Sequence, residues 1–344
     1  MKQPQWPVST EREMELLRQV LESDRWGGYH EFVKQFEHEF AAFVHCAHGV
    51  SAMNGTVTLE MALAAAGVGP GNEVIVPAIS FISTATAVSR VGATPVFVDI
   101  EPLSFNMDPE RAAAAVTPRT KAIIPVHFGG PMADMDRLLP LAAKHGLAVI
   151  EDAAHAHGSE WNGRRAGSLG LAGSFSFQNS KVMTAGEGGM LTTNDTGFAE
   201  RAWSLMDQGR KPGGGWFHHF VLASNYRITG LHAAVLLAQL ERLPEQICRR
   251  TRNAATREPE ALHSPVAAPD GSTALRSRRP LCGLASWVPP WVPPWKRVRL
   301  GDGQRDGTSL TPSLIAPTVP ATARSSRREA NSAPDASQSG TATW

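Results

Sequence analysis

The chain has 344 residues, of which 42% are hydrophobic and 19% are charged, so it can bury a large core in one big domain or two smaller ones. Its formal net charge of +1 gives no general attraction to nucleic acid or acidic membranes, which leaves small molecules or a second copy of the chain as expected partners. No leader-like apolar segment opens the sequence and no run of about 18 apolar residues occurs, so we expect a cytoplasmic protein rather than an exported or membrane-spanning one.

From about residue 10 to residue 254, predicted helices alternate with short apolar strands, a pattern typical of a three-layer α/β domain. Thr10 and Glu13 have capping-box spacing and start the first helix, and "EFVKQFEHEFAAFV" is a second amphipathic helix. The runs "EVIVP", "TPVFVDI", "KAIIPV" and "LAVIED" predict strands, and "ADMDRLLPLAAKHG" predicts a helix before the last of them. Because these strand sequences are apolar on both faces, they favour a parallel sheet between helix layers.

Residues 255–344 have a different composition, without a sustained period of 2 or 3.6. The four prolines of "WVPPWVPP" exclude a regular helix there, and large apolar residues are scarce. We therefore predict a large domain over residues 1–254 and a Pro/Arg/Ser-rich tail that is disordered or only locally structured. A shifted reading frame in a GC-rich gene is our preferred explanation for this tail; a polyproline ligand or an arginine contact with nucleic acid is the alternative.

A single lysine stands in "SFSFQNSKVMTAGEGG", residues 174–189, between an alternating apolar run and a glycine-rich turn. A buried lysine must lose its charge or find a partner, which makes Lys181 a candidate nucleophile; a surface lysine on a loop is the alternative. The hydroxyl of Ser176 can face the same pocket. Gly186, Gly188 and Gly189 allow a tight turn and a close backbone approach, for which a structural reason also suffices.

Two further segments carry candidate ligand contacts. Asp152 ends the strand "LAVIED", and ligands of open α/β sheets bind at the carboxyl ends of parallel strands, although the side chain can equally cap the segment that follows. Asn54-Gly55-Thr56 precedes an apolar helix, so its N–H groups and the hydroxyl of Thr56 suit a phosphate, with plain helix capping as the alternative. The three cysteines are far apart and predict neither a disulfide framework nor a metal site.

Five motifs occur in one order along the chain: Asn-Gly-Thr at 54–56, Glu-Asp-Ala-Ala-His-Ala-His-Gly at 151–158, Ser-Phe-x-x-x-Lys at 176–181, Gly-Glu-Gly-Gly at 186–189 and Asn-Tyr-Arg at 225–227. In this order they resemble the DegT/DnrJ/EryC1/StrS family of pyridoxal-phosphate aminotransferases, over roughly residues 5 to 254. The resemblance implies a three-layer αβα fold of type I, like aspartate aminotransferase, with a mostly parallel central sheet. It also implies a homodimer with active sites at the subunit interface, and a small C-terminal domain that residues 255–344 do not resemble.

The resemblance also implies roles for individual residues around pyridoxal 5′-phosphate. Lys181 matches the lysine that forms an imine with the cofactor aldehyde and then carries protons, and Asp152 matches the acid facing the pyridine nitrogen. His155 stands where many relatives have glutamine and would contact the phenolic oxygen of the ring or the substrate. Phe81 resembles the aromatic residue that stacks on the ring, although a phenylalanine in such a run would otherwise be core.

The cofactor phosphate would be held by Gly55, Thr56 and Ser176, and by Asn225 from across the dimer interface. Arg227 can bind a substrate carboxylate or phosphate, or equally brace the interface. No metal is expected.

The leading hypothesis for function is transfer of an amino group from L-glutamate or L-glutamine to a keto-sugar or cyclitol. The segments "SFQNSKVMTAGEGG", "PVHFGGPMADMD" and "DAAHAHG" also look like the 3-amino-5-hydroxybenzoate synthases, which makes a pyridoxal-phosphate lyase the first alternative. Because the tail does not resemble the domain that closes over the substrate, a catalytically inactive, cofactor-binding scaffold is the second alternative.

Overall fold

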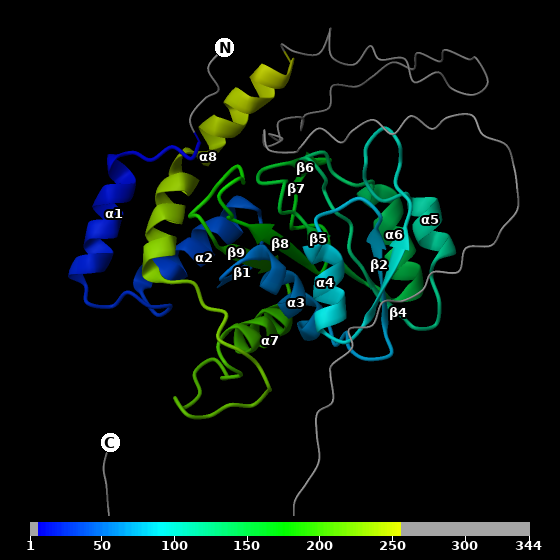
Figure 1. The fold of residues 1–344 in the computed structure, drawn as a ribbon, viewed down its shortest axis with the longest axis horizontal. Coiled ribbons are helices and arrows are strands. Elements are labelled where there is room, and N and C mark those ends of the chain that lie inside the picture. The colour runs from blue at the N-terminus through cyan, green and yellow to red at the C-terminus, as the bar shows by residue number, and fades with distance from the viewer. Residues whose placement is uncertain (1–5, 256–344) are drawn as a thin grey trace, which may run out of the picture. The chain divides into compact units, whose positions relative to one another are not determined.

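A seven-stranded sheet crosses the middle of the molecule, whose residues 6–255 are described by a computed structural model (Figure 1). Its strand order is β1-β9-β8-β5-β4-β2-β3, and β9 pairs antiparallel with both β8 and β1 while the other pairs are parallel. The strands are β1 (His48–Ala52), β2 (Glu73–Pro77), β3 (Thr94–Val98), β4 (Thr120–Ile123), β5 (Ala148–Asp152), β8 (Ala172–Ser176) and β9 (Gly189–Thr193), with a separate hairpin of β6 (Glu160–Trp161) and β7 (Arg164–Arg165).

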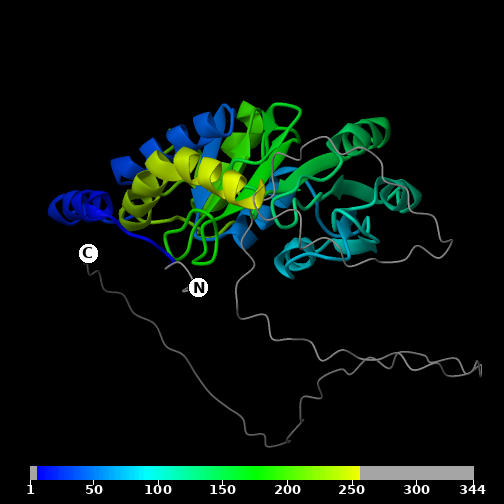
Figure 2. The same ribbon diagram turned by 90° about the horizontal axis from the view of Figure 1, so that it is seen from above.

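Helices cover both faces of the sheet, which confirms the predicted three-layer architecture (Figures 1 and 2). The helices that contribute to the core on one face are α1 (Glu11–Glu22), α2 (Glu31–Phe43), α5 (Pro109–Ala114), α6 (Met135–His145) and α8 (Gly230–Ala255). Those on the other face are α3 (Gly55–Ala65), α4 (Ser83–Arg90) and α7 (Thr196–Met206). None of the helices between residues 6 and 255 is both long and apolar enough to cross a membrane.

The inner strands are apolar on both faces because each face is covered by a layer of helices, as the sequence predicted. Along β2, Ile75 points into one core while Val74 and Val76 point into the other, because successive side chains of a strand alternate between faces. The strand β3 differs from this expectation. It forms an edge of the sheet, and Phe97 within it is 59% exposed.

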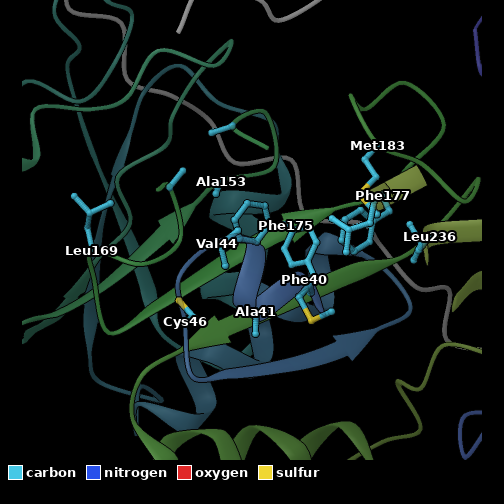
Figure 3. Packing of buried hydrophobic residues seen from close by; sticks show 14 of the residues in the cluster. Phe40, Ala41, Val44, Cys46, Ala153, Leu169, Phe175, Phe177, Met183 and Leu236 are labelled. Carbon is cyan, nitrogen blue, oxygen red and sulfur yellow. The ribbon is translucent and has the colours of Figure 1, made fainter. Parts of the chain in front are cut away.

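The core on the α2 side is built around phenylalanine rings that lie beneath the end of β8 (Figure 3). The ring of Phe40 on α2 lies 5.0 Å from that of Phe175 and 5.3 Å from that of Phe177, both in edge-on contact. This packing fixes the end of β8, and therefore the start of the loop that carries Lys181.

The ends of the first helices also follow the sequence. The side chain of Glu13 accepts hydrogen bonds from the backbone N–H of Thr10 at 2.9 Å and from its hydroxyl at 2.6 Å, so the predicted capping box is confirmed. The predicted division at residues 254/255 stays a prediction, because residues 256–344, and with them nearly all of the predicted tail, lie outside the described part.

Replacing Phe175 with alanine should lower the free energy of unfolding by about 3–5 kcal/mol, because a buried ring is lost and a cavity is left. The matched control Phe97→Ala, at the exposed edge of the sheet, should cost about 0.5 kcal/mol or less. Denaturant unfolding of both variants measures the difference, and equal losses would contradict the described packing.

Candidate active site

The candidate site lies where the carboxyl ends of β5 and β8 meet the first turn of α3. Asp152 pairs in register with Ser174 on β8, and Ser176 follows two residues later on the same face. A Cβ atom added to Gly55 would lie 2.8 Å from the Cβ of Ser176, so glycine is required where α3 approaches the strand. The fold thus brings Asp152, Gly55 and Ser176, which are far apart in the sequence, to the end of the sheet where β5 and β8 finish.

Asp152 is almost fully buried, at 6% exposure, and its carboxylate is held on both oxygens. Oδ2 accepts a hydrogen bond from the hydroxyl of Thr84 at 2.7 Å, and Oδ1 accepts one from the N–H of Ala154 at 3.3 Å. Because the single hydroxyl proton of Thr84 is used on Asp152, the 2.6 Å contact between Ser80 and Thr84 has Ser80 as the donor. The residues after Asp152 form turns, so its side chain caps no helix.

Thr84 and Ser80 were not predicted as site residues. Nothing in "AISFISTATA" distinguishes a hydroxyl that supports Asp152 from one that merely caps a helix. What identifies Thr84 is its contact with Asp152, which joins α4 to β5 and two residues that are 68 positions apart in the sequence.

Lys181 lies in the loop between β8 and β9 and is partly buried. Burial lowers the pKa of its ammonium group below the usual value of 10.5, and the negative charge of Asp152 partly opposes that shift. Within residues 6–255 its Nζ takes part in no hydrogen bond or ion pair. The side chain therefore offers an amine that gives up its proton more readily than a surface lysine.

His155 is partly buried beside Lys181 and Asp152. Burial lowers the pKa of its imidazole to about 4, with a further lowering by the charge of Lys181 and an opposing effect of Asp152. Its Nδ1 accepts a hydrogen bond from the N–H of Gly129 at 3.3 Å. The ring is therefore neutral at pH 7 and carries its proton on Nε2, which makes it a hydrogen-bond donor.

The first turn of α3 combines several groups that can donate hydrogen bonds. Asn54 caps the helix, its side chain accepting from the N–H of Val57 at 3.0 Å, and the first N–H groups of a helix have no intrahelical partner. The hydroxyl of Thr56 lies 2.7 Å from that of Ser83 at the start of α4. The surroundings of Gly55 thus combine a helix N-terminus with neutral hydroxyl groups, a combination that suits a phosphate.

Phe81 follows the carboxyl end of β2 and is 66% exposed, so the interpretation of this residue as core is wrong. It lies three residues before Thr84, whose hydroxyl contacts Asp152, and its carbonyl accepts the N–H of Thr84 at 3.1 Å. An exposed aromatic ring near a buried carboxylate is available to stack on a flat ligand. Stacking by Phe81 stays a prediction.

The segment that carries Asn225 and Arg227 lies close to the start of α3, since the N–H of Met53 donates to the carbonyl of Tyr226 at 2.8 Å. The guanidinium of Arg227 is bonded to the buried carboxylate of Asp207. No contact joins Arg227 to Lys181 or Asp152 within the described residues, so both of its interpretations, a substrate contact and a brace of the interface, stay predictions. Asn225 is exposed on the surface of its own chain.

His157 belongs to the motif at residues 151–158, but the sequence predicts no role for it. Its ring is 4% exposed and packs against Phe40, Phe175 and Phe177, with ring centroids 6.5, 5.4 and 5.7 Å away. Among residues 6–255, neither ring nitrogen has a hydrogen-bond partner. Burial, followed by the charges of Lys181 and His155, lowers its pKa to about 3. A neutral imidazole therefore lies within electrostatic range of the amine of Lys181.

These residues fit a small aromatic aldehyde that carries a ring nitrogen and a phosphate. The amine of Lys181 suits the aldehyde, and the buried carboxylate of Asp152 suits a protonated ring nitrogen. The notch at Gly55 and the α3 N-terminus suit the phosphate, and the exposed ring of Phe81 suits the aromatic face. The donor set is thus that expected for pyridoxal 5′-phosphate, although each assignment remains a prediction.

Comparison with known proteins gives the same family. The sequence profile of the DegT/DnrJ/EryC1/StrS aminotransferase family matches residues 7–264. The chain is 48% identical over 252 residues to a 3-amino-5-hydroxybenzoate synthase of Amycolatopsis mediterranei (strain S699), covering 72% of this chain and 64% of that protein. It is 47% identical over 222 residues to a GDP-perosamine synthase of Caulobacter vibrioides, covering 64% and 59%. The chain therefore spans less than two thirds of the length of these relatives.

Solved structures agree with the sequence comparison. A crystal structure of 3-amino-5-hydroxybenzoic acid synthase superimposes with a TM-score of 0.72 at 46% identity, covering 74% of this chain and 67% of that one. Another similar protein is named L-glutamine:scyllo-inosose aminotransferase, and two of the similar structures are described with PMP. The predicted type I fold is confirmed.

Replacing His157 with phenylalanine should stabilise the protein more at pH 5 than at pH 8. The folded pKa of about 3 lies below the ordinary value of 6.5, so between these values the unfolded chain binds a proton that the folded chain does not. The stability due to the neutral ring is present above pH 6.5 and is lost as the pH falls toward 3. At pH 5 the substitution removes a penalty of about 2 kcal/mol, at 1.36 kcal/mol per pKa unit.

Denaturant unfolding at the two pH values measures this effect, with His145→Gln on the exposed end of α6 as the control. A gain in stability that is the same at pH 5 and pH 8 would show that His157 is not held neutral by the fold.

Proposed function

Because the chain belongs to the DegT/DnrJ/EryC1/StrS aminotransferase family, we propose that it binds pyridoxal 5′-phosphate through Lys181 and moves an amino group to a keto-sugar or cyclitol. The family and its solved neighbours depend on this cofactor. The observation that carries the proposal is the free amine of Lys181, with a lowered pKa, in electrostatic reach of the buried Asp152.

The cofactor, when bound, supplies a ring that accepts electron density from the carbon next to the amino group. Asp152 would hold a proton on the ring nitrogen, and its two hydrogen bonds, from Thr84 and Ala154, keep its carboxylate aimed. His155 donates from Nε2 to an oxygen of the cofactor or the substrate. Gly55, Thr56 and Ser176 hold the phosphate with neutral donors.

Lys181 has a second task once a donor amino acid occupies the site. Its amine would then be free, and because burial lowers its pKa it gives up its own proton more readily than a surface lysine and could take one from the Cα of the donor. The same amine would deliver that proton to the cofactor carbon that carries the aldehyde group, because it is already in position and needs no diffusion. L-glutamate and L-glutamine are the proposed donors, and the second is named for a similar protein.

The relatives support more than one acceptor of the amino group. GDP-perosamine synthase and L-glutamine:scyllo-inosose aminotransferase support a keto-sugar or a cyclitol. The 48% identity to a 3-amino-5-hydroxybenzoate synthase supports the alternative of a lyase that uses the same lysine. All these activities are extended to this chain from relatives of which it spans 59–64%, and a cofactor-binding scaffold without turnover is the third candidate.

The proposal includes a homodimer in the cytoplasm. Asn225 is exposed near the start of α3, and although its Oδ1 accepts the N–H of Arg227 at 3.4 Å, its amide N–H₂ is available to a second copy of the chain. Large apolar side chains are exposed in the segment just before it: Trp216, Phe217, Phe220, Val221 and Leu222. Such a cluster is typical of a surface that another chain covers.

Replacing Lys181 with alanine should abolish the visible absorbance band that pyridoxal phosphate acquires on covalent attachment. The purified full chain is mixed with the cofactor, scanned, reduced with borohydride and digested, and the added mass should map to the peptide with Lys181. Lys144→Ala, on the exposed end of α6, is the matched control and should keep the band. A band that persists without Lys181 would refute the assignment.

Addition of L-glutamate or L-glutamine should bleach that band if the protein is an aminotransferase. A band that no donor bleaches would favour the lyase or the scaffold. Asp152→Asn should retain the band, because Lys181 is intact, and slow the bleaching by about 100-fold or more, because the ring nitrogen loses its charged partner. Stopped-flow absorbance gives the rate. An unchanged rate would remove Asp152 from the proposed mechanism.

A further inference from the structure

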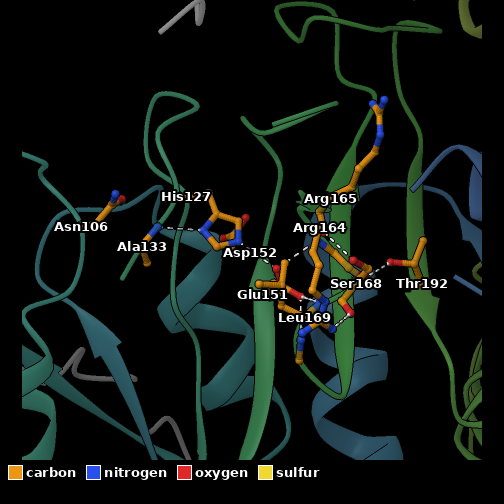
Figure 4. A network of polar contacts seen from close by, with 12 residues as sticks. Asn106, His127, Ala133, Glu151, Asp152, Arg164, Arg165, Ser168, Leu169 and Thr192 are labelled. Carbon is orange, nitrogen blue, oxygen red and sulfur yellow. Dashed lines mark hydrogen bonds and ion pairs between the residues drawn. The ribbon is translucent and has the colours of Figure 1, made fainter. Parts of the chain in front are cut away.

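The residue before Asp152 is a carboxylate with no solvent exposure, which the proposed mechanism does not use. Glu151 lies on the opposite face of β5 and accepts four hydrogen bonds (Figure 4). Oε1 accepts the N–H groups of Leu169 and Gly170, both at 2.8 Å, and Oε2 accepts the N–H of Gly167 at 3.0 Å. The fourth donor is His127, whose Nε2 lies 3.0 Å from Oε2.

The hydrogen bonds of His127 define which of its nitrogens carries the proton. Nδ1 accepts the N–H of Ala133 at 3.2 Å, so the neutral ring is protonated on Nε2 and donates to Glu151 (Figure 4). The backbone of His127 is held as well, its N–H donating to the carbonyl of Asp152 at 3.1 Å. Its own carbonyl accepts the N–H of Gly130 at 3.2 Å. Glu151 thus anchors the loop that begins at His127.

That loop is in direct contact with His155. The N–H of Gly129 donates to Nδ1 of His155 at 3.3 Å, and the ring of Phe128 packs edge-on against the imidazole at 5.7 Å. Gly129 has φ +72°, a left-handed conformation that favours glycine. The direction of its N–H therefore depends on how the loop is held, and Asn106 supports it by accepting the N–H of Phe128 at 3.0 Å.

We infer that Glu151 and His127 are positioning residues that fix the tautomer of His155. By holding the loop, they keep the N–H of Gly129 against Nδ1, and a donor in that place excludes the tautomer with its proton on Nδ1. His155 is left with one arrangement, in which Nε2–H is presented to an oxygen in the site. The use of that donor rests on the proposed function, whereas the tautomer is a property of the chain itself.

The residue type at position 155 makes this support necessary. A glutamine there would offer its amide N–H₂ as a donor without help from a second group. A histidine supplies a donor at the same place only when its other nitrogen is occupied by a donor from the protein. Glu151, His127 and Gly129 provide that condition.

Nitrogen-15 labelling of histidine in the full chain tests the proposal without cofactor. Long-range proton–nitrogen correlation spectra at neutral pH should show His155 as a single Nε2–H tautomer, and His155→Gln identifies its signals by their loss. In His127→Phe, which removes both the donor to Glu151 and the acceptor for Ala133, we expect the His155 signals to move to those of mixed tautomers. His127→Gln, whose amide has both a donor and an acceptor, should restore the single tautomer.

A purely structural role predicts loss of stability without this shift. Cys46→Ala is the matched control, because Cys46 is buried on the same side and donates to the carbonyl of Gly167 at 3.3 Å, but does not touch the loop of His127. It should leave the tautomer of His155 unchanged. If His127→Phe does not fold, Glu151→Gln and Gly129→Ala are measured in its place and should give the same mixing. A folded His127→Phe, Glu151→Gln or Gly129→Ala variant in which His155 remains the single Nε2–H tautomer would overturn the inference.

The outcome is separate from that of the proposed function. If His155 has the expected tautomer and Lys181 forms no bond with pyridoxal phosphate, the positioning role stands and the aminotransferase proposal fails. If the cofactor binds but His155 shows mixed tautomers in the unmodified chain, the positioning role fails alone.

Discussion

The arrangement of the site depends on a buried carboxylate that cannot remain unpaired. Glu151 has no exposure to solvent, and burial of its two carboxyl oxygens is tolerated because four donors surround them. Three of them belong to the loop that precedes β8 and one to the loop that follows β4. Since adjacent strand residues point to opposite faces, the same end of β5 turns Asp152 toward α3 and α4. The dipeptide Glu151-Asp152 therefore couples the loops on one face of the sheet to the carboxylate of Asp152 on the other face.

Around that dipeptide the fold makes three basic groups harder to protonate than they are in water. Burial lowers the pKa values of Lys181, His155 and His157, and the positive charge of Lys181 lowers those of both histidines further. Asp152 is the opposing influence on Lys181 and His155. A site of this kind favours an uncharged amine and neutral hydrogen-bond donors beside a single carboxylate. Those are the forms that attack on an aldehyde and protonation of a ring nitrogen require.

Periodic segments could be predicted from the sequence because local physics determines them. The capping box at Thr10, the apolar runs of the inner strands and the placement of Asp152 at a strand end each follow from a few neighbouring residues. The exposure of Phe81 and the edge position of β3 could not be predicted, since they depend on which other elements of the fold pack beside them. The support of Asp152 by Thr84, and of His155 by the loop of His127, joins residues more than 20 positions apart and leaves no local pattern.

Arg227 is held within its own chain by a contact that the sequence did not reveal. Its guanidinium is bonded to Asp207, and the same carboxylate accepts the hydroxyl of Tyr29 at 2.9 Å and a guanidinium N–H of Arg210 at 3.2 Å. An anionic substrate would have to displace a buried carboxylate that holds three donors, and this would leave Asp207 incompletely paired. The cluster instead ties both ends of the segment 207–227 to Tyr29. Arg227 therefore contributes by holding that segment, and with it Asn225, in place beside the start of α3.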